Sequence, residues 1–305
     1  MRILIIGGSG FLGQNIIGKL AEQGEKVTVP TRRLAHAREL LVLPTVTVQT
    51  GDVYDDNKLN EWVRDHDAVI NLVGVLHSRP GKPYGPDFER AHVTLPARIA
   101  KACVEHGVKR FIHVSALGAD ANGPSGYQRS KAAGEAAIWE ACKGHDKPCV
   151  TIFRPSVVFG PGDKFMNMFA KLARVFPVLP LAGSKTRMQP VYVGDVAQAV
   201  VNALTFDEMC HQTFDLAGPH IYTLGELVKL AAQWSGNDRS VVDLPLSIGR
   251  LQAALFECLP GEPLMSRDNL DSLKVDNVSD QPISPLLKIL PTALEAIAPI
   301  YLRQG

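Results

Sequence analysis

The sequence has few cysteines and no excess of charge of either sign. Its five cysteines lie far apart in 305 residues, at Cys103, Cys142, Cys149, Cys210 and Cys258. An odd, scattered set without a Cys-x-x-Cys pair predicts free thiols in a reduced chain, and we expect a cytoplasmic protein. The 32 Lys and Arg residues balance 31 Asp and Glu residues, which leaves a net charge of +1. Nucleic acid is therefore not an expected partner, because binding to phosphates requires clustered cations.

Long apolar runs and metal-binding motifs are also missing. The best candidate for a membrane helix, residues 283–302, is interrupted by Lys288, Glu295 and three prolines, so we do not expect it to span a bilayer. The nine histidines are dispersed without a His-Glu-x-x-His pair, so no metal site is expected. His113 lies in an apolar segment and is expected to be a core residue with satisfied hydrogen bonds.

Short apolar runs alternate with helical patterns from the first residue onward. The runs expected to form strands cover residues 2–6, 26–29, 46–49, 68–73, 111–114 and 150–153. The segments between them have helical periodicity, most clearly at 127–142. This alternation predicts a parallel sheet with crossover helices.

The pattern changes after Pro155. A helix is expected at 165–176, a strand at 190–193, a helix from an Asp195 N-cap to Leu204, and a short strand at 213–216. From Pro219 onward the sequence is helical and interrupted by prolines. We therefore expect an α/β protein with two parts. Residues 1–155 and 189–217 form a doubly wound parallel sheet, and 156–188 and 218–305 form a smaller, mostly helical C-terminal lobe.

A glycine-rich turn joins the first expected strand to the first helix, with the spacing G-x-x-G-x-x-G. Gly7 permits the tight turn, Gly10 lacks the Cβ that would block a pyrophosphate, and Gly13 allows helix and strand to pack closely. At a strand-to-helix junction this turn predicts a dinucleotide site made by Gly7, Gly10, Phe11, Leu12 and Gly13. The alternative is a turn that serves packing alone.

The end of the second expected strand indicates which dinucleotide is favoured. An NAD site of this type has a carboxylate about 20 residues after the glycine loop, which binds the ribose 2′-hydroxyl. This sequence has Arg32 and Arg33 there. Because a guanidinium pairs with a 2′-phosphate, NADP is the favoured cofactor and NAD the alternative. Both arginines could instead be ordinary surface charges.

Tyr127 and Lys131 lie four residues apart in the helix that follows the fifth expected strand. That spacing places a phenol and an ammonium on one helical face and predicts contact between them. The cation would stabilise the phenolate and lower the pKa of Tyr127 from about 10, so that it can act as acid or base at neutral pH. In a dinucleotide fold this position meets the nicotinamide.

Together these features resemble the extended and atypical short-chain dehydrogenases/reductases, over nearly the whole chain. The resemblance rests on the glycine loop, on Tyr127 with Lys131, and on segments 71–74, 154–163 and 190–196. Within that group the chain is most similar to the complex I alpha-subcomplex subunit 9 family, through segments 69–74, 111–115, 189–193 and 262–268. The implied fold is a Rossmann sheet of the NAD-dependent epimerase/dehydratase type.

The resemblance implies further roles. Asp52 and Val53 would flank the adenine, Leu72, Val73 and Gly74 would line the phosphates and ribose, and Pro155, Val157 and Val158 would cover the carboxamide side. Lys131 would bind the nicotinamide ribose, and Tyr127 would donate or accept the proton. The active reductases also carry a hydroxyl that polarises the carbonyl. Its position here is either Ser115 or Ala116, and in the second case reduction should be slow.

Three functions remain open at this point. The first is an NADP-dependent oxidoreductase, the second a non-catalytic NADPH-binding accessory or assembly protein, and the third a sugar-nucleotide epimerase/dehydratase. Apolar residues in the lobe favour an apolar or quinone-like substrate unless they are simply its core: Phe165, Met166, Met168 and Phe169. The apolar segment 241–305 is expected either to bind a respiratory-complex partner or a membrane surface, or to pack internally.

Overall fold

The computed structural model describes residues 1–258, 261, 263 and 265–303. Its centre is a seven-stranded parallel sheet with the strand order β11-β6-β5-β4-β1-β2-β3. These strands are β1 (Arg2–Ile6), β2 (Lys26–Thr31), β3 (Val46–Thr50), β4 (Ala68–Asn71), β5 (Arg110–Val114), β6 (Cys149–Pro155) and β11 (Gln212–Leu216). The expected parallel sheet is confirmed. Two expected strands differ. β4 is shorter than expected, because the Asn71 side chain accepts the Val73 N–H at 3.1 Å and ends the strand in a turn. The strand expected at 190–193 covers only Val191–Tyr192 and lies outside this sheet.

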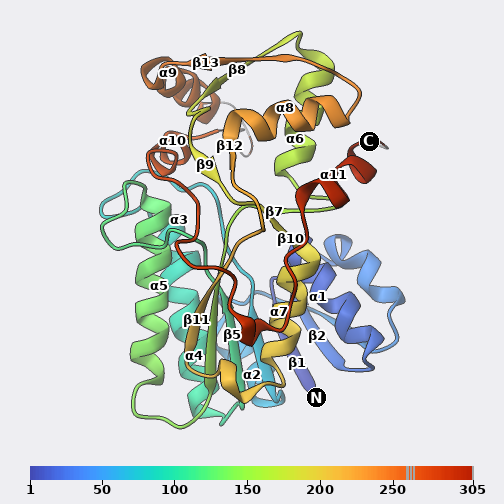
Figure 1. Ribbon diagram of the computed structural model, residues 1–305. Helices are drawn as coiled ribbons and strands as arrows, with labels where there is room; N and C mark the ends of the chain where they lie inside the picture. The colour runs from blue at the N-terminus through green and yellow to red at the C-terminus, as the bar shows by residue number, and fades with distance from the viewer. Residues whose placement is uncertain (259–260, 262, 264, 304–305) are drawn as a thin grey trace.

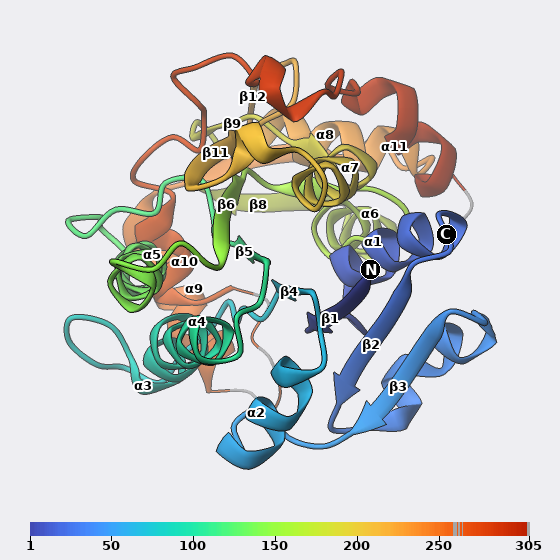
Figure 2. The same cartoon turned by 90° about the horizontal axis from the view of Figure 1, so that it is seen from below.

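Helices cover both faces of the sheet (Figures 1 and 2). One face packs against α1 (Phe11–Glu22), η1 (Leu34–Val42) and α7 (Val193–Ala203), and the other against α2 (Asp56–Arg64), α4 (Leu95–Glu105) and α5 (Gly126–Cys142). Ile3 and Ile5 of β1 face the first cluster, whereas Leu4 and Ile6 face the second. Both faces of the central strand are therefore buried, which is why its sequence is apolar without alternation.

The strand order reverses at β1, which has β2 on one side and β4 on the other. Connections that leave neighbouring strands in opposite directions open a crevice at the carboxyl ends of those strands. Ile6 at the end of β1 pairs with Asn71 at the end of β4. The glycine loop after β1 and the segment after β4 therefore start side by side at this crevice.

A separate apolar cluster lies above the carboxyl ends of the sheet, at the top of Figure 1. It is formed by α6 (Phe165–Val175), α8 (Leu224–Trp234) and α11 (Leu294–Leu302). Met166 and Phe169 are buried in it, and Phe165 and Met168 pack against it. These four side chains are thus core of the lobe, as the alternative interpretation held, and give no evidence about a substrate.

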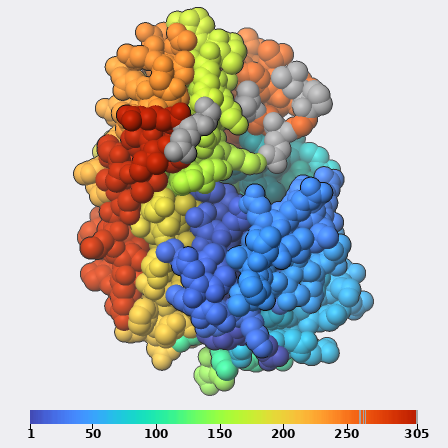
Figure 3. Space-filling model, turned by 90° about the vertical axis from the view of Figure 1, so that its right-hand side faces the viewer, coloured from blue at the N-terminus to red at the C-terminus, as the bar shows by residue number. Residues whose placement is uncertain are grey.

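Short elements complete the lobe and its connections. Three two-stranded pairs are β7 (Val158–Phe159) with β10 (Val191–Tyr192), β9 (Arg187–Met188) with β12 (Tyr222–Thr223), and β8 (Val178–Ala182) with β13 (Ser240–Leu244). The remaining helices are α3 (Pro86–Phe88), η2 (Glu89–Thr94), η3 (Asp207–Met209), α9 (Leu246–Glu257), α10 (Arg267–Ser272) and η4 (Pro285–Leu287). Figure 3 shows the lobe stacked on the N-terminal part of the chain, with the lime-coloured α6 region between them.

The C-terminal segment returns to the sheet before it ends in the lobe. Leu287 is buried in the same cluster as Ile3, and the red chain runs beside α7 in Figure 1. The Asp195 carboxylate accepts the backbone N–H and the hydroxyl of Thr292 at 2.7 and 3.0 Å. The expected N-cap at Asp195 is therefore wrong: α7 begins at Val193, and Asp195 is needed to hold this segment. The two-part division of the chain remains a proposal.

Cys149 and Cys210 form a disulfide, so the prediction of free thiols is wrong for this pair. β6 and β11 are neighbours in the sheet, and the loop before β11 brings Cys210 to the first residue of β6. The Arg110 guanidinium donates to both sulfur atoms, at 3.1 and 2.9 Å. A separation of 61 residues gives no local signal of this pairing in the sequence. No helix of the described residues is long and apolar enough to cross a bilayer.

Candidate functional site

The glycine loop is fixed by contacts that only glycine permits. Gly7 has a φ of +84°, and a Cβ there would lie 3.2 Å from backbone atoms of Leu72 and Val73. At Gly13 a Cβ would lie 2.3 Å from the Gly8 carbonyl oxygen, so this glycine packs the helix on the loop itself. At Gly10 the nearest atom is 3.4 Å away. The loop is thus held against the segment after β4 while the side at Gly10 stays open.

The N-terminus of α1 presents backbone donors at this loop. Gly10 is its N-cap residue. Among the described residues, no side chain accepts a hydrogen bond from the first N–H groups as a cap. Its first turn, which contains Phe11 and Leu12, also has no acidic residue. The backbone N–H groups and the positive end of the helix dipole are therefore suited to an anion. Together with the space at Gly10, they fit a pyrophosphate.

Positive charge gathers at the ends of β2 and β3. Arg32 and Arg33 are exposed directly after β2, in a turn that the Thr31 hydroxyl stabilises by donating to the Arg33 carbonyl at 3.1 Å. Two further cations approach Tyr54, since the Arg90 guanidinium lies 3.8 Å from its ring centre and Arg98 donates to its carbonyl at 3.2 Å. Burial raises the pKa of Tyr54, and the charges of Arg90 and Arg32 oppose that shift. Arg32 is therefore close enough for its charge to act on Tyr54, and it belongs to the same positive cluster.

Asp52 and Val53, the predicted adenine neighbours, form the turn after β3. The Asp52 carboxylate accepts the Tyr54 N–H at 3.1 Å, which fixes that turn. Val53 is partly buried against the cluster beneath α2 and α4. Both lie beside the positive cluster, at the end of the strand next to β2.

A buried histidine that the sequence did not single out connects the segment after β4 to α5. The Val75 N–H donates to Nε2 of His92 at 3.0 Å, and Nδ1 lies 2.9 Å from the Ser130 hydroxyl. Ser130 in turn donates to the Tyr127 carbonyl at 2.8 Å. Because Nε2 accepts, the ring proton resides on Nδ1. Burial lowers the pKa of His92 to about 2, assisted by the charge of Lys131.

His92 lies in a π-helical turn, η2, a geometry often found at functional sites. Gly134 makes its approach to α5 feasible, since a Cβ there would lie 1.8 Å from the His92 carbonyl oxygen. No sequence signal identified His92, because its partners Val75 and Ser130 are 17 and 38 residues away. His113 fulfils its expectation: it is buried, and Asn71 Nδ2 lies 3.1 Å from its Nδ1.

Tyr127 and Lys131 are each held by partners on other elements. The Tyr127 ring packs edge-on against Phe88 and His92, at 5.9 and 5.4 Å between ring centres. Lys131 is buried and donates through Nζ to the Val114 carbonyl at 3.1 Å. A Cβ on Gly74 would lie 3.8 Å from that Nζ. The structure therefore brings the predicted Lys131 and Gly74 together.

The expected effect of Lys131 on Tyr127 is wrong. The pKa of Tyr127 is raised to about 12, and burial is the cause. The ammonium is directed at the end of β5 instead, and its own pKa is lowered to about 8 by burial, partly offset by the charge of Glu135. At neutral pH Tyr127 is therefore a protonated phenol, the form that a proton donor requires, and burial makes it a weaker acid than a free tyrosine.

The Ser115 hydroxyl is bonded to the ion pair of Glu135 and Arg154. Its hydroxyl donates to the Glu135 carboxylate, and Arg154 binds the same carboxylate through Nε and a terminal nitrogen. Glu135 is buried, so the pair satisfies a charge that burial would otherwise penalise strongly. The Ser115 hydrogen is thus already donated to Glu135, whereas a carbonyl-polarising group must donate to the substrate.

The segment after β6 closes the crevice. Pro155 is buried at the end of the strand, and Val157 and Val158 pack against the lobe and sheet clusters, respectively. The Ser156 hydroxyl donates to Oδ1 of Asn277 at 2.6 Å, and Asn277 donates to the Leu117 carbonyl at 3.0 Å. These bonds tie the loops after β5 and β6 to the C-terminal part of the chain.

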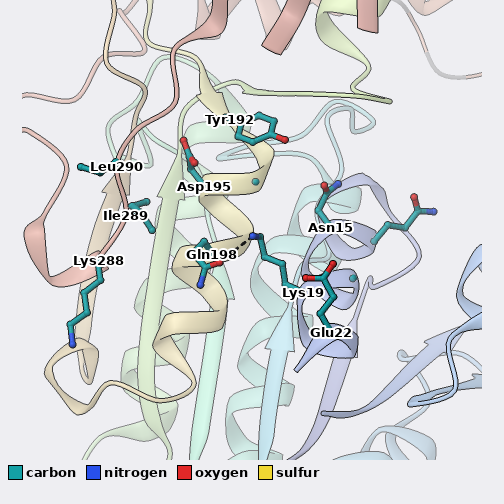
Figure 4. A pocket seen from close by; sticks show the side chains of 12 residues that line it. Asn15, Lys19, Glu22, Tyr192, Asp195, Gln198, Lys288, Ile289 and Leu290 are labelled. Carbon is teal, nitrogen blue, oxygen red and sulfur yellow. Dashed lines mark hydrogen bonds between the residues drawn. The ribbon is translucent and has the colours of Figure 1, made fainter. Parts of the chain in front are cut away.

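A hollow of about 730 Å³ lies elsewhere, between α1 and α7 (Figure 4). Lys19 points across it and donates to Gln198 at 3.1 Å, and Glu22, Asp195 and Leu290 also line it. It contains none of the residues predicted to bind the dinucleotide. Among the described residues there is also no group of three His, Cys, Asp or Glu residues that could hold a metal ion.

Comparisons with known proteins agree with this geometry. The model of the NAD dependent epimerase/dehydratase family matches residues 3–217. NADH dehydrogenase (ubiquinone) 1 alpha subcomplex subunit 9 of Mus musculus is 35% identical over 299 residues, covering 95% of this chain and 77% of its own. The NADH-ubiquinone oxidoreductase 40 kDa subunit of Neurospora crassa is 33% identical over 90% of this chain and 71% of its own. A ceramide reductase of Caulobacter vibrioides is 32% identical over 65% of this chain and 59% of its own.

Solved structures share the fold. UDP-glucuronic acid 4-epimerase from Bacillus cereus, solved with UDP-glucuronic acid and NAD, has a TM-score of 0.73 at 17% identity, over 100% of this chain and 99% of its own. Pal from Bacillus thuringiensis has a TM-score of 0.78 at 16% identity, over 100% and 98%. At this identity the likeness shows the fold alone. The sheet, the glycine loop and the sequence matches together show that the chain belongs to the NAD dependent epimerase/dehydratase family, among relatives of complex I alpha subcomplex subunit 9.

Proposed function

We propose that this chain binds NADP(H) in the crevice above β1, β2 and β4, and reduces an apolar or quinone-like carbonyl compound. The observation that carries the binding is the glycine loop, open at Gly10 beneath an uncapped α1 N-terminus, with Arg32 at the end of the neighbouring strand. The NAD in the Bacillus cereus structure and the name of the family support a nicotinamide dinucleotide. The name of the Caulobacter relative, a ceramide reductase, supports an apolar substrate.

In this proposal the chain contributes a proton donor and a fixed ribose site. Tyr127 holds the proton that passes to the carbonyl oxygen, and with its raised pKa it carries this proton at neutral pH. Lys131 lies beside Gly74, where it would bind the nicotinamide ribose. The hydrogen bonds through His92 and Ser130 keep Val75 and α5 at a fixed separation. A bound nicotinamide supplies the hydride in such a site.

A second candidate is a non-catalytic NADPH-binding accessory protein of a respiratory complex. The specific observation in its favour concerns Ser115. Its hydroxyl donates to the Glu135 carboxylate, and the next residue, Ala116, has no hydroxyl. A site without a polarising donor loses about 10²–10³-fold in rate by analogy with other carbonyl-activating sites. The complex I relatives support this candidate.

One experiment separates the two candidates. The protein is purified, the nucleotide that accompanies it is identified, and NADPH absorbance is followed with quinones, long-chain ketones, aldehydes and sugar nucleotides. Turnover with an apolar member of this panel supports the oxidoreductase. Tight NADPH binding without turnover on any member supports the accessory protein, and absence of nucleotide binding contradicts both.

We expect Arg32→Ala to remove most of the preference for NADP(H). The lost charge-assisted hydrogen bond to the 2′-phosphate should weaken NADPH binding by about 1.5–3 kcal/mol, with NADH binding nearly unchanged. Calorimetry with both nucleotides measures the difference. The matched control is Arg38→Ala, which removes an equally exposed arginine from η1. Equal affinities for the two nucleotides in the unmodified protein would contradict the assignment of Arg32.

We also propose that the outer face of α9 binds a partner protein or a membrane surface. Leu251 is 75% exposed and Leu255 65% exposed, with Ile248 on the same stripe. A double variant, Leu251→Ser with Leu255→Ser, should lose retention in liposome co-sedimentation or pull-down while keeping nucleotide affinity. Leu290→Ser, at a position that is 90% exposed on another segment, is the control. If the unmodified protein retains neither lipid nor protein, this assignment is wrong.

A further inference from the structure

A carboxylate from the lobe closes the N-terminus of the helix that carries Tyr127. Asp268 Oδ1 accepts the Gly126 N–H at 2.6 Å, and Oδ2 accepts the Tyr127 N–H at 3.0 Å. These are the first two residues of α5, after its N-cap residue Ser125. Ser125 forms its own capping box with Gln128, so it satisfies other donors of the same turn. The two bonds to Asp268 span more than 140 residues of sequence.

The position of Asp268 is itself fixed from several sides. α10, which carries it, lies above the start of α5 in Figure 1. The Arg267 backbone and guanidinium donate to Glu257 of α9, at 2.7 and 2.8 Å. The Asn269 side chain donates to the Leu76 carbonyl at 3.4 Å, in the segment after β4. α10 therefore connects the lobe to both walls of the crevice.

Asp268 lies where its charge can oppose the positive end of the α5 dipole. The N-terminus of a helix carries a partial positive charge, which favours a nearby anion such as a phenolate. A carboxylate bound to the first two N–H groups neutralises that charge. Titratable groups on the elements packed here include Lys131 and Arg129 on α5, whose cations donate to the Val114 and Gly123 carbonyls. His92 on η2, which packs on the Tyr127 ring, is neutral, and Tyr84 lies beside Gly126. From α10, the Asp268 carboxylate faces this end of the helix and accepts the Tyr127 N–H.

We propose that Asp268 is a positioning residue for Tyr127, which opposes ionisation of the phenol and fixes its depth in the crevice by capping α5 from the lobe. This proposal rests on the proposed function, in which Tyr127 is the proton donor. Asp268 touches neither the reacting atoms nor the phenol, and it acts through the backbone of α5. Its removal should therefore change the acidity of Tyr127 rather than only the stability of the protein.

The test compares Asp268→Asn with Asp271→Asn in the full-length protein. Asparagine keeps a hydrogen-bonding side chain at the cap and removes the charge. Asp271 lies on the same short helix, where its carboxylate pairs with Arg250 and Lys274 instead of α5. Both proteins are labelled with 3-fluorotyrosine, whose lower intrinsic pKa brings the titration into an accessible range. Fluorine NMR follows it, and the Tyr127 signal is assigned with Tyr127→Phe.

We expect Asp268→Asn to lower the titration midpoint of Tyr127 by about 0.5–1 pH unit, and Asp271→Asn to leave it unchanged. The alkaline limb of the rate profile should move by the same amount. Equal midpoints in the two variants would overturn the proposal. If Asp268→Asn does not fold, Asp268→Ser replaces it, because serine also removes the charge and can still cap the helix. A midpoint equal to that of the unmodified protein then contradicts the proposal. If the midpoint shifts but the protein turns over no substrate, the effect of Asp268 on Tyr127 is supported. Only the proposed reaction is then contradicted.

Discussion

Replacing Tyr127 by Phe should lower any carbonyl reduction by about 100-fold or more. The change removes the proton donor and keeps the ring, which packs on Phe88 and His92, so the crevice should retain its shape. General acid catalysis of this kind typically contributes about 10²–10⁴-fold. NADPH affinity should change little, because among the described residues the phenol makes no hydrogen bond that holds the glycine loop. Steady-state kinetics and calorimetry on the same preparation measure both quantities.

Two further measurements make this test specific. Tyr54→Phe is the matched control, since this tyrosine lies in the positive cluster near Arg90 and not beside Lys131. It should leave the maximal rate unchanged. An unaltered rate in Tyr127→Phe would mean that the proton comes from another group, and Tyr127 would then be only a packing residue.

Acidification from pH 7 to pH 5 should lower the contribution of two buried histidines to the free energy of unfolding by about 3–4 kcal/mol. His92 and His113 are buried, and burial is the main reason that their pKa values lie far below the ordinary 6.5. Both rings stay neutral in the folded protein at pH 5 but take up protons once the chain unfolds. The unfolded state therefore binds more protons in this range, so stability rises with pH and is lost as pH falls. Each histidine contributes nearly 2 kcal/mol over these two units.

Urea unfolding at pH 7, 6 and 5 measures this dependence. His36→Gln serves as the control, because that histidine is exposed in η1 and should leave the slope unchanged. His113→Asn should reduce the slope by about half if the variant folds. A free energy of unfolding that is constant between pH 7 and pH 5 would show that both rings are protonated in the folded protein or become exposed.

The strands and the glycine loop could be predicted because their signals are local. Apolar runs such as Ile3–Ile6 need only a few residues to be recognised. Gly7 has a positive φ, and Gly13 is required by a contact with Gly8 inside the same turn. The same holds for the helix of Tyr127 and Lys131, whose relation is fixed by helical spacing. The parallel sheet followed from the alternation of these units.

The parts that the sequence did not predict depend on partners far apart in the chain. Lys131 was expected to act on its helical neighbour Tyr127, but its ammonium reaches the Val114 carbonyl on β5. Asp268 and His92 form their hydrogen bonds with residues of other elements, so the spacing of residues along the sequence could not identify them. Asp195 has the right residue type for an N-cap and is instead bound to Thr292. In each case a tertiary hydrogen bond outweighs a local preference.

The cross-link between Cys149 and Cys210 encloses the whole excursion that leaves the sheet after β6 and returns to it at β11. Within this ring the consecutive side chains of Val175, Phe176, Pro177 and Val178 are exposed, which offers a protease an accessible peptide. A single cut there would leave the two fragments covalently joined. An electrophoresis gel without reductant would show one undivided band, and only a reduced sample would reveal the cleavage.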